Sequence, residues 1–143
     1  MAFNLTIPQV RDTVFTYFNN KWDNLTPIKY DNIDSNINYN EDWLRISLMV
    51  NNPDLSAIGQ TYFRMRGIIF IQLFTLSNNG LSNNDEYTNK IIEEMTQVEL
   101  ENNVNLQESE INKTGISQDT NGVYFQTNIS IKFYYDTRRS TGV

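Results

Sequence analysis

Residues 58–80 read IGQTYFRMRGIIFIQLFTLSNNG, with two arginines, a glycine and a long apolar run in one order. Between residues 62 and 76 β-branched and aromatic residues dominate and proline is absent, which predicts a long strand. After Gly67 apolar residues occupy both odd and even positions, so we expect both faces of this half to be covered. The first half places Tyr62, Arg64 and Arg66 on one face, because side chains alternate along a strand. The strand should therefore begin at the surface and enter the core after Gly67, where a glycine indicates a bend or close packing.

Three other segments predict strands. Residues 42–50 alternate apolar and polar side chains, and residues 104–111 do so more weakly. Asn121-Gly122 is typical of a tight hairpin turn, and it precedes the clearest alternation in the chain. That last strand should point Val123, Phe125, Thr127, Ile129, Ile131, Phe133 and Tyr135 to one side, and Tyr124, Gln126, Asn128, Ser130, Lys132 and Tyr134 to the other. Residues 136–143 are expected to form a loose C-terminal tail.

Two helices complete the pattern. Thr6 and Gln9 can form a capping box around Pro8, and Val10, Val14, Phe18 and Trp22 follow at helical spacing. A second helix is expected after Gly80, capped by Ser82 with Asp85, with an apolar stripe of Tyr87, Ile91, Ile92, Met95 and Val98. Residues 19–40 and 101–122 are expected to be long polar loops, with at most one short strand near Ile28 and Tyr30.

Together these segments predict a single α+β domain over residues 1–143. A mostly antiparallel sheet should carry two α-helices packed on it, because a half-apolar sheet must bury its apolar face. The length is that of one domain with a core of its own.

Composition restricts the possible functions. The chain has no cysteine and no histidine, which excludes cysteine nucleophiles, serine–histidine triads and sites built on thiolate or imidazole ligands. Its net charge of −6 argues against non-specific binding to nucleic acid. The acidity is local, because residues 85–110 hold eight Asp or Glu residues and one Lys. No apolar run reaches the ~18 residues that a membrane span requires, so no membrane partner is expected.

Several short motifs occur in one order along the chain. Pro27-Ile28-Lys29-Tyr30 comes first, then Trp43-Leu44-Arg45, then Ile58-Gly59, Tyr62-x-Arg64-x-x-Gly67, Gln72-x-Phe74 and Gly80, and finally Gly122-Val123-Tyr124-Phe125-Gln126. In this order the chain resembles the tail terminator proteins of long-tailed bacteriophages, the family typified by the lambda minor tail protein U. The likeness spans about residues 8–136. It departs at Thr75-Leu76-Ser77, where the family pattern would have a proline.

The resemblance implies a small α+β subunit that closes into a homo-hexameric ring. Such a ring caps the tail tube, stops its polymerisation and offers a joining surface to the head. The implied partners are other copies of the chain, the major tail tube protein and a neck or head-completion protein. DNA would pass through the lumen without specific binding. The implied location is the junction of tail and head in a virion assembled in the host cytoplasm, and no cofactor, metal or enzymatic activity is implied.

Candidate interface residues follow from the patterns, each with a plainer alternative. They are Tyr62, Arg64, Arg66, Glu93, Glu94, Tyr124 and Tyr134. The arginines either pair with a neighbouring subunit's acidic helix or are solvated at a strand end. The glutamates, with Glu99 and Glu101, either line a DNA channel or form a solvated helix face. Tyr124 and Tyr134 either anchor a partner or are simply exposed strand tyrosines.

Two other functions remain open from the sequence alone. The chain could be another phage head–tail connector or a tail-tube subunit. It could also be an enzyme that holds a divalent ion with Glu41 and Asp42, or with Glu93 and Glu94. Adjacent carboxylates diverge on a strand and on a helix, so neither pair converges and no enzyme is expected.

Overall fold

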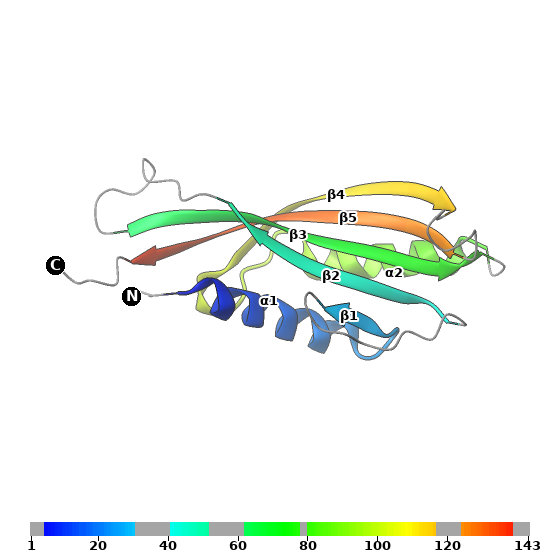
Figure 1. Cartoon of the computed structure of the whole chain (residues 1–143), viewed down its shortest axis with the longest axis horizontal. Helices are drawn as coiled ribbons and strands as arrows, with labels where there is room; N and C mark the ends of the chain where they lie inside the picture. Colours follow the sequence, from blue (N-terminus) through cyan, green and yellow to red (C-terminus); the bar gives the residue numbers. More distant parts are fainter. Residues whose placement is uncertain (1–4, 31–40, 52–61, 78–79, 117–123, 139–143) are drawn as a thin grey trace.

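The computed structural model describes residues 5–30, 41–51, 62–77, 80–116 and 124–138. Its elements, in chain order, are α1 (Ile7–Trp22), β1 (Ile28–Tyr30), β2 (Trp43–Val50), β3 (Tyr62–Leu76), α2 (Ser82–Met95), the 3-10 turn η2 (Glu101–Asn103), β4 (Asn105–Ile116) and β5 (Tyr124–Arg138). The strands form one sheet in the order β1-β2-β3-β5-β4 (Figure 1). Among the described strands only β1 and β2 pair in parallel, so the sheet is mixed and the predicted α+β class is confirmed.

The longest pairing joins β3 to β5 without interruption. It runs from Tyr62 opposite Arg138 to Leu76 opposite Tyr124. Residues far apart in sequence are therefore held in strict register across the middle of the sheet. Because a slip by one residue would turn every apolar side chain to the wrong face, this register determines which side chains share a face.

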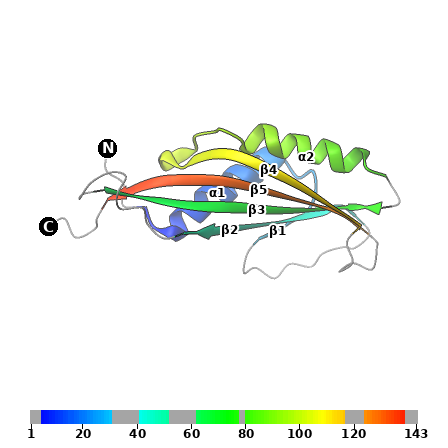
Figure 2. The same ribbon diagram turned by 90° about the horizontal axis from the view of Figure 1, so that it is seen from above.

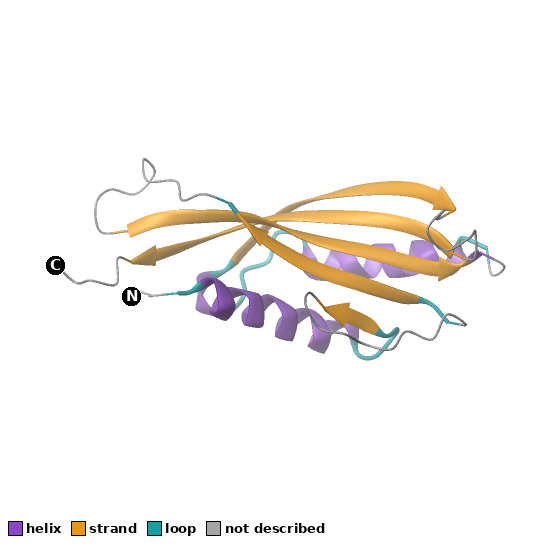
Figure 3. Ribbon diagram, in the orientation of Figure 1, coloured by secondary structure: helices purple, strands orange, loops and turns teal. Residues whose placement is uncertain are grey.

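Both helices pack on the same face of the sheet, as Figure 3 shows. The core between the layers contains Val14 and Trp22 of α1, Ile91 of α2, and Ile71 and Ile129 of the central strands. The view from above in Figure 2 shows α2 alongside β4, with α1 crossing behind the strands.

The prediction that β3 is covered on both faces is wrong. Ile69, Ile71 and Leu73 are fully buried under the helices, whereas Phe70 on the opposite face is 36% exposed. In the described residues no helix packs on that second face. An apolar run indicates that a strand is apolar on both sides, but it does not say which side has an element to cover it.

Helix α1 begins as its sequence predicts. The Thr6 side chain accepts a hydrogen bond from the Gln9 backbone, and the Gln9 side chain accepts one from the Thr6 backbone, which completes the capping box. At the other end the Trp22 indole donates to Thr26 at 2.9 Å. The helix turns Val10, Val14, Phe18 and Trp22 to the core, as expected.

Helix α2 differs from its prediction at both ends. It begins at Ser82 after Leu81, and its N-cap residue makes no side-chain capping hydrogen bond with the described residues. Asp85 instead binds Lys113 of β4, with 2.9 Å between Oδ1 and Nζ. The helix ends at Met95, so Val98 lies beyond it. Its buried side chains include two polar residues outside the predicted stripe, Asn84 and Thr88.

Asn84 is buried because its amide is satisfied on both sides. Its Nδ2 donates to Thr75 Oγ1 at 3.0 Å, and its Oδ1 accepts from Thr127 Oγ1 at 2.7 Å and from Lys113 Nζ at 3.0 Å. These bonds connect α2 to β3, β5 and β4. A buried amide that is hydrogen-bonded through both its nitrogen and its oxygen stabilises one arrangement of helix and sheet over its alternatives.

The loops are shorter than expected. β4 continues to Ile116, with register shifts after Leu106 and after Lys113, so residues 101–122 are not one long loop. The alternation is weak because these bulges interrupt it. β5 likewise continues to Arg138, so residues 136–138 do not belong to a loose tail. The short strand expected near Ile28 is β1, while the Asn121-Gly122 turn lies outside the described residues.

Gly67 lies where two strands leave no room for a side chain. A Cβ there would overlap the Met49 carbonyl oxygen and would lie 2.5 Å from Cζ of Phe133. The predicted close packing at this glycine is confirmed.

Candidate interaction surface

The candidate site is the side of the sheet opposite the helices, which we call the open face. Alternation and register place side chains from four strands on it. They are Trp43, Arg45, Ser47 and Met49 of β2, Arg64, Arg66, Ile68, Phe70, Gln72 and Phe74 of β3, Glu110 and Asn112 of β4, and Tyr124, Gln126, Asn128, Ser130, Lys132, Tyr134 and Asp136 of β5.

One end of the open face is closed by aromatic rings. Trp43 and Phe74 stack with 4.3 Å between ring centroids, and Tyr124 meets both edge-on at 6.4 and 6.2 Å. The Tyr124 hydroxyl donates to the Glu41 carbonyl at 3.0 Å. This small second core is separate from the core under the helices. Such ring contacts add to the stability of this end of the sheet beyond the area that they bury.

A polar pair extends the aromatic end toward the middle. Arg45 donates to Gln72 Oε1 at 3.3 Å, and its guanidinium lies 5.6 Å from the Trp43 ring centroid. The guanidinium therefore combines a hydrogen bond with a cation–π contact, which fixes a positive charge over the sheet.

The middle of the open face is apolar and exposed. Met49 is 57% exposed and Phe70 is 36% exposed, and half-buried Ile68 lies next to Met49 in the paired strands. Beside them is a hollow of about 430 Å³. Its lining is mainly hydroxyl, amide and carboxylate groups around Phe70, from Ser47, Gln72, Glu110, Asn112, Asn128 and Ser130. Such a mixture suits contact with another protein surface, where an apolar centre has a polar rim.

The other end of the open face carries the predicted arginines. Arg64 pairs with Asp136 of the same chain and lies over Tyr134, 4.2 Å from the ring centroid. The carboxylate that pairs with Arg64 therefore belongs to the same chain. One of the two predicted alternatives places that carboxylate on the acidic helix of a neighbouring subunit. Arg66 is exposed one step further along the same face.

Tyr124 is wrongly predicted as an exposed anchor. It is 0% exposed, because the aromatic end encloses it. Tyr124 points to the predicted side of its strand. The alternation of side chains along a strand does not show, however, that neighbouring rings cover one of them. Tyr134 is half-buried beneath Arg64, so its role at an interface stays a prediction. The structure does not describe the side chain of Tyr62.

Glu93 and Glu94 lie on different sides of α2, as expected for adjacent residues of a helix. Glu93 lies on the exposed side of α2, where Asn89 donates to it at 3.4 Å. Glu94 turns toward α1, where its carboxylate and burial together raise the pKa of Tyr17, burial being the larger cause. Asp42 accepts a hydrogen bond from the Leu76 backbone at 2.8 Å and also contacts Tyr87. In the described part of the chain no group of three acidic residues is placed to hold a metal ion.

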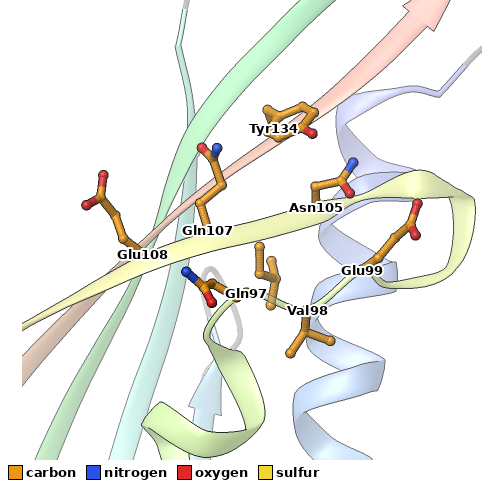
Figure 4. A pocket seen from close by; sticks show the side chains of 8 residues that line it. Gln97, Val98, Glu99, Asn105, Gln107, Glu108 and Tyr134 are labelled. Atoms are coloured by element: carbon orange, nitrogen blue, oxygen red, sulfur yellow. The ribbon is translucent and has the colours of Figure 1, made fainter.

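A second hollow, of about 490 Å³, lies beside the first residues of β4. Segment 97–99 pairs with β4 there through Val98 and Leu106, which exchange backbone hydrogen bonds at 3.2 and 2.8 Å. Figure 4 shows the carboxylates of Glu99 and Glu108 and the ring of Tyr134 around it. This hollow borders the cationic end of the open face and has an acidic rim.

Sequence reasoning missed the residues at the middle of the open face. The sequence places Met49 on the side of its strand opposite the apolar row, and Phe70 in an apolar row expected to be covered, and it predicts neither as part of an interaction surface. The signal that could have found them is the pairing register, because Met49 lies opposite Ile68, and Phe70 opposite Ser47 and Ser130.

These features define the class of the protein as a single α+β domain whose mixed sheet has one helix-covered face and one open face. No protein-family model matches the sequence, and no curated protein is similar to it. Among solved structures, a protein whose name states no function has a similar fold, with a TM-score of 0.58 and 12% sequence identity. The likeness covers 90% of this chain and 96% of that one. None of the described helices is long and apolar enough to cross a membrane.

Proposed function

We propose that this chain is a structural virion protein that caps a phage tail tube. In this role it stops tube polymerisation and offers a joining surface to the head or neck. Its partners are copies of itself in a hexameric ring, the major tail tube protein and a neck protein, with DNA passing through the lumen. It acts through its surfaces, without catalysis or a cofactor.

The observation that supports this function best is the convergence of separate motifs at one place. Trp43 and Arg45, Gln72 and Phe74, and Tyr124 come from three of the motifs on which the resemblance rests. All of them meet at the aromatic end of the open face. Residues spread over about 80 positions in sequence are thus used to make one charged corner of the sheet.

The geometry of the subunit suits a closing ring. A head-to-tail contact between two different surfaces of one chain gives a ring when its rotation closes and a fibre when it does not. A subunit with a helix-covered face and an open face has two unlike sides for such a contact. A ring of this kind ends tube growth if its far side does not recruit another layer.

The test is assembly with and without the protein. We expect phage particles that lack this chain to carry tails of abnormal length and heads without joined tails, and we expect purified protein to arrest growing tubes at a fixed length. Tails of normal length on filled heads would refute the proposal. Electron microscopy of the purified chain separates the other phage roles, because a tube subunit would form long tubes and a terminator short rings.

A further inference from the structure

We propose that the open face binds the exposed acidic side of α2 from a second copy of this chain. We call that side the acidic helix face, formed by Glu86 and Glu93, which lie seven residues apart on the exposed side of α2. The proposal rests on the proposed function, because it names the two surfaces that meet between neighbouring subunits of the ring.

The first argument is the exposed apolar centre of the open face. Met49 is 57% exposed and Phe70 is 36% exposed on a surface that no described element covers. Most exposed apolar side chains occur singly, but these two lie on adjacent paired strands beside Ile68. Removing a clustered apolar surface from water favours association, so this centre indicates a contact.

The second argument is charge. The β2 and β3 half of the open face carries Arg45 and Arg66 around the apolar centre. The acidic helix face carries the carboxylates of Glu86 and Glu93 against Lys90, and α2 has no basic residue in its last turn. The carboxyl end of a helix already bears partial negative charge, so acid placed there is unfavourable within one subunit. An arginine-rich surface of a neighbour would relieve that repulsion.

The third argument is direction. The buried residues of α2, which include Asn84 and Ile91, point toward the sheet, so Glu86 and Glu93 point away from it. The open face lies on the other side of the same sheet. The two surfaces therefore face opposite ways, and a contact between them is head-to-tail, as a ring requires.

Cross-linking between single cysteines tests the contact directly. The chain has no cysteine, so each introduced thiol is the only one. We would prepare Met49→Cys for the open face and Glu93→Cys for the acidic helix face, and treat them, separately and mixed, with a short bismaleimide. The expected result is a covalent dimer in the mixture, at least tenfold more abundant than in either variant alone. Ile111→Cys is the control, because Ile111 is 47% exposed on β4 and belongs to neither surface.

Charge reversal provides the second readout. In sedimentation experiments, Arg45→Glu and Glu93→Arg should each weaken self-association about tenfold, and mixing the two variants should restore binding between them. Rescue by mixing requires that the two side chains lie on different surfaces that meet. Equal weakening by Lys21→Glu, which changes an exposed residue of α1 outside both surfaces, would contradict the charge argument.

Two results would overturn the inference. One is a Met49→Cys dimer formed as readily as the mixed dimer, which would mean that two open faces bind each other. The other is a monomer at every concentration, which would assign the open face to a different protein. Neither result depends on tail length, so the proposed function is judged separately. Normal tails without the protein would refute that function even if the mixed dimer forms.

Discussion

Arg64 holds Asp136 through two hydrogen bonds across β3 and β5. Nε lies 2.8 Å from Oδ1, and Nη2 lies 3.2 Å from Oδ2. The guanidinium also lies over Tyr134, so one side chain binds both a carboxylate and a ring. Arg64 therefore links β3 to β5 and also places a positive charge on the open face.

We expect Arg64→Lys to lower the free energy of unfolding by about 0.5–1 kcal/mol, because an ammonium cannot bind two carboxylate oxygens and stack on a ring at once. Urea unfolding at low and high salt measures the change. Lys132→Ala is the matched control, because Lys132 and Glu108 form a longer and more exposed pair on the same face, 3.4 Å apart. Equal losses for both variants would show that the second hydrogen bond and the ring contact contribute nothing.

Gly67→Ala should destabilise the sheet by roughly 1–3 kcal/mol, the usual cost of overpacking. The new methyl group would meet the Met49 carbonyl and the Phe133 ring. The Met49 carbonyl cannot move without weakening the backbone hydrogen bonds between the strands. The Phe133 ring, in contrast, can be replaced by a smaller side chain. In the Phe133→Leu background, Gly67→Ala should therefore cost less than in the native chain. Thermal unfolding of the four proteins gives this coupling, and strict additivity would contradict the steric account.

The sequence predicts the helices and most of the strands, but it predicts less well which side chains are exposed. Long periodic segments such as α1 and β5 are clear because their apolar residues repeat along a single face. The face of β3 with Ile68 and Phe70 is wrongly predicted to be buried, because the burial of a strand face depends on elements distant in the chain. Tyr124 is mispredicted for the same reason, since Trp43 and Phe74 enclose it. Asn84 breaks the apolar stripe of α2, and only Thr75, Thr127 and Lys113, brought together by the fold, explain its burial.

Asn84→Ala should lower the free energy of unfolding by about 1–3 kcal/mol, because it leaves buried hydroxyl groups without a partner. Chemical denaturation measures the loss. Asn89→Ala, on the exposed side of the same helix, controls for helix propensity and should stabilise α2 or leave it unchanged. In the Thr127→Val background, Asn84→Ala should lower the free energy of unfolding by a smaller amount. One of the hydroxyl groups that Asn84→Ala leaves without a partner is already absent there. A loss at Asn84→Ala no larger than that at Asn89→Ala would refute the role of this network.

High pH should destabilise the protein through buried Tyr135 and half-buried Tyr17. Burial raises the pKa of Tyr135 above the ordinary 10.0, and burial with the Glu94 charge does the same for Tyr17. A raised pKa means that the folded state favours the neutral phenol, so this stability is complete below pH 10 and is lost as pH rises through the folded-state value. Tyr135→Phe removes the titrating group and keeps the ring. In urea unfolding, the loss of stability between pH 9 and pH 11 should therefore be smaller for this variant than for the native chain, and Glu94→Gln should act the same way through Tyr17. Parallel pH profiles for all three proteins would show that these phenols do not couple ionisation to folding.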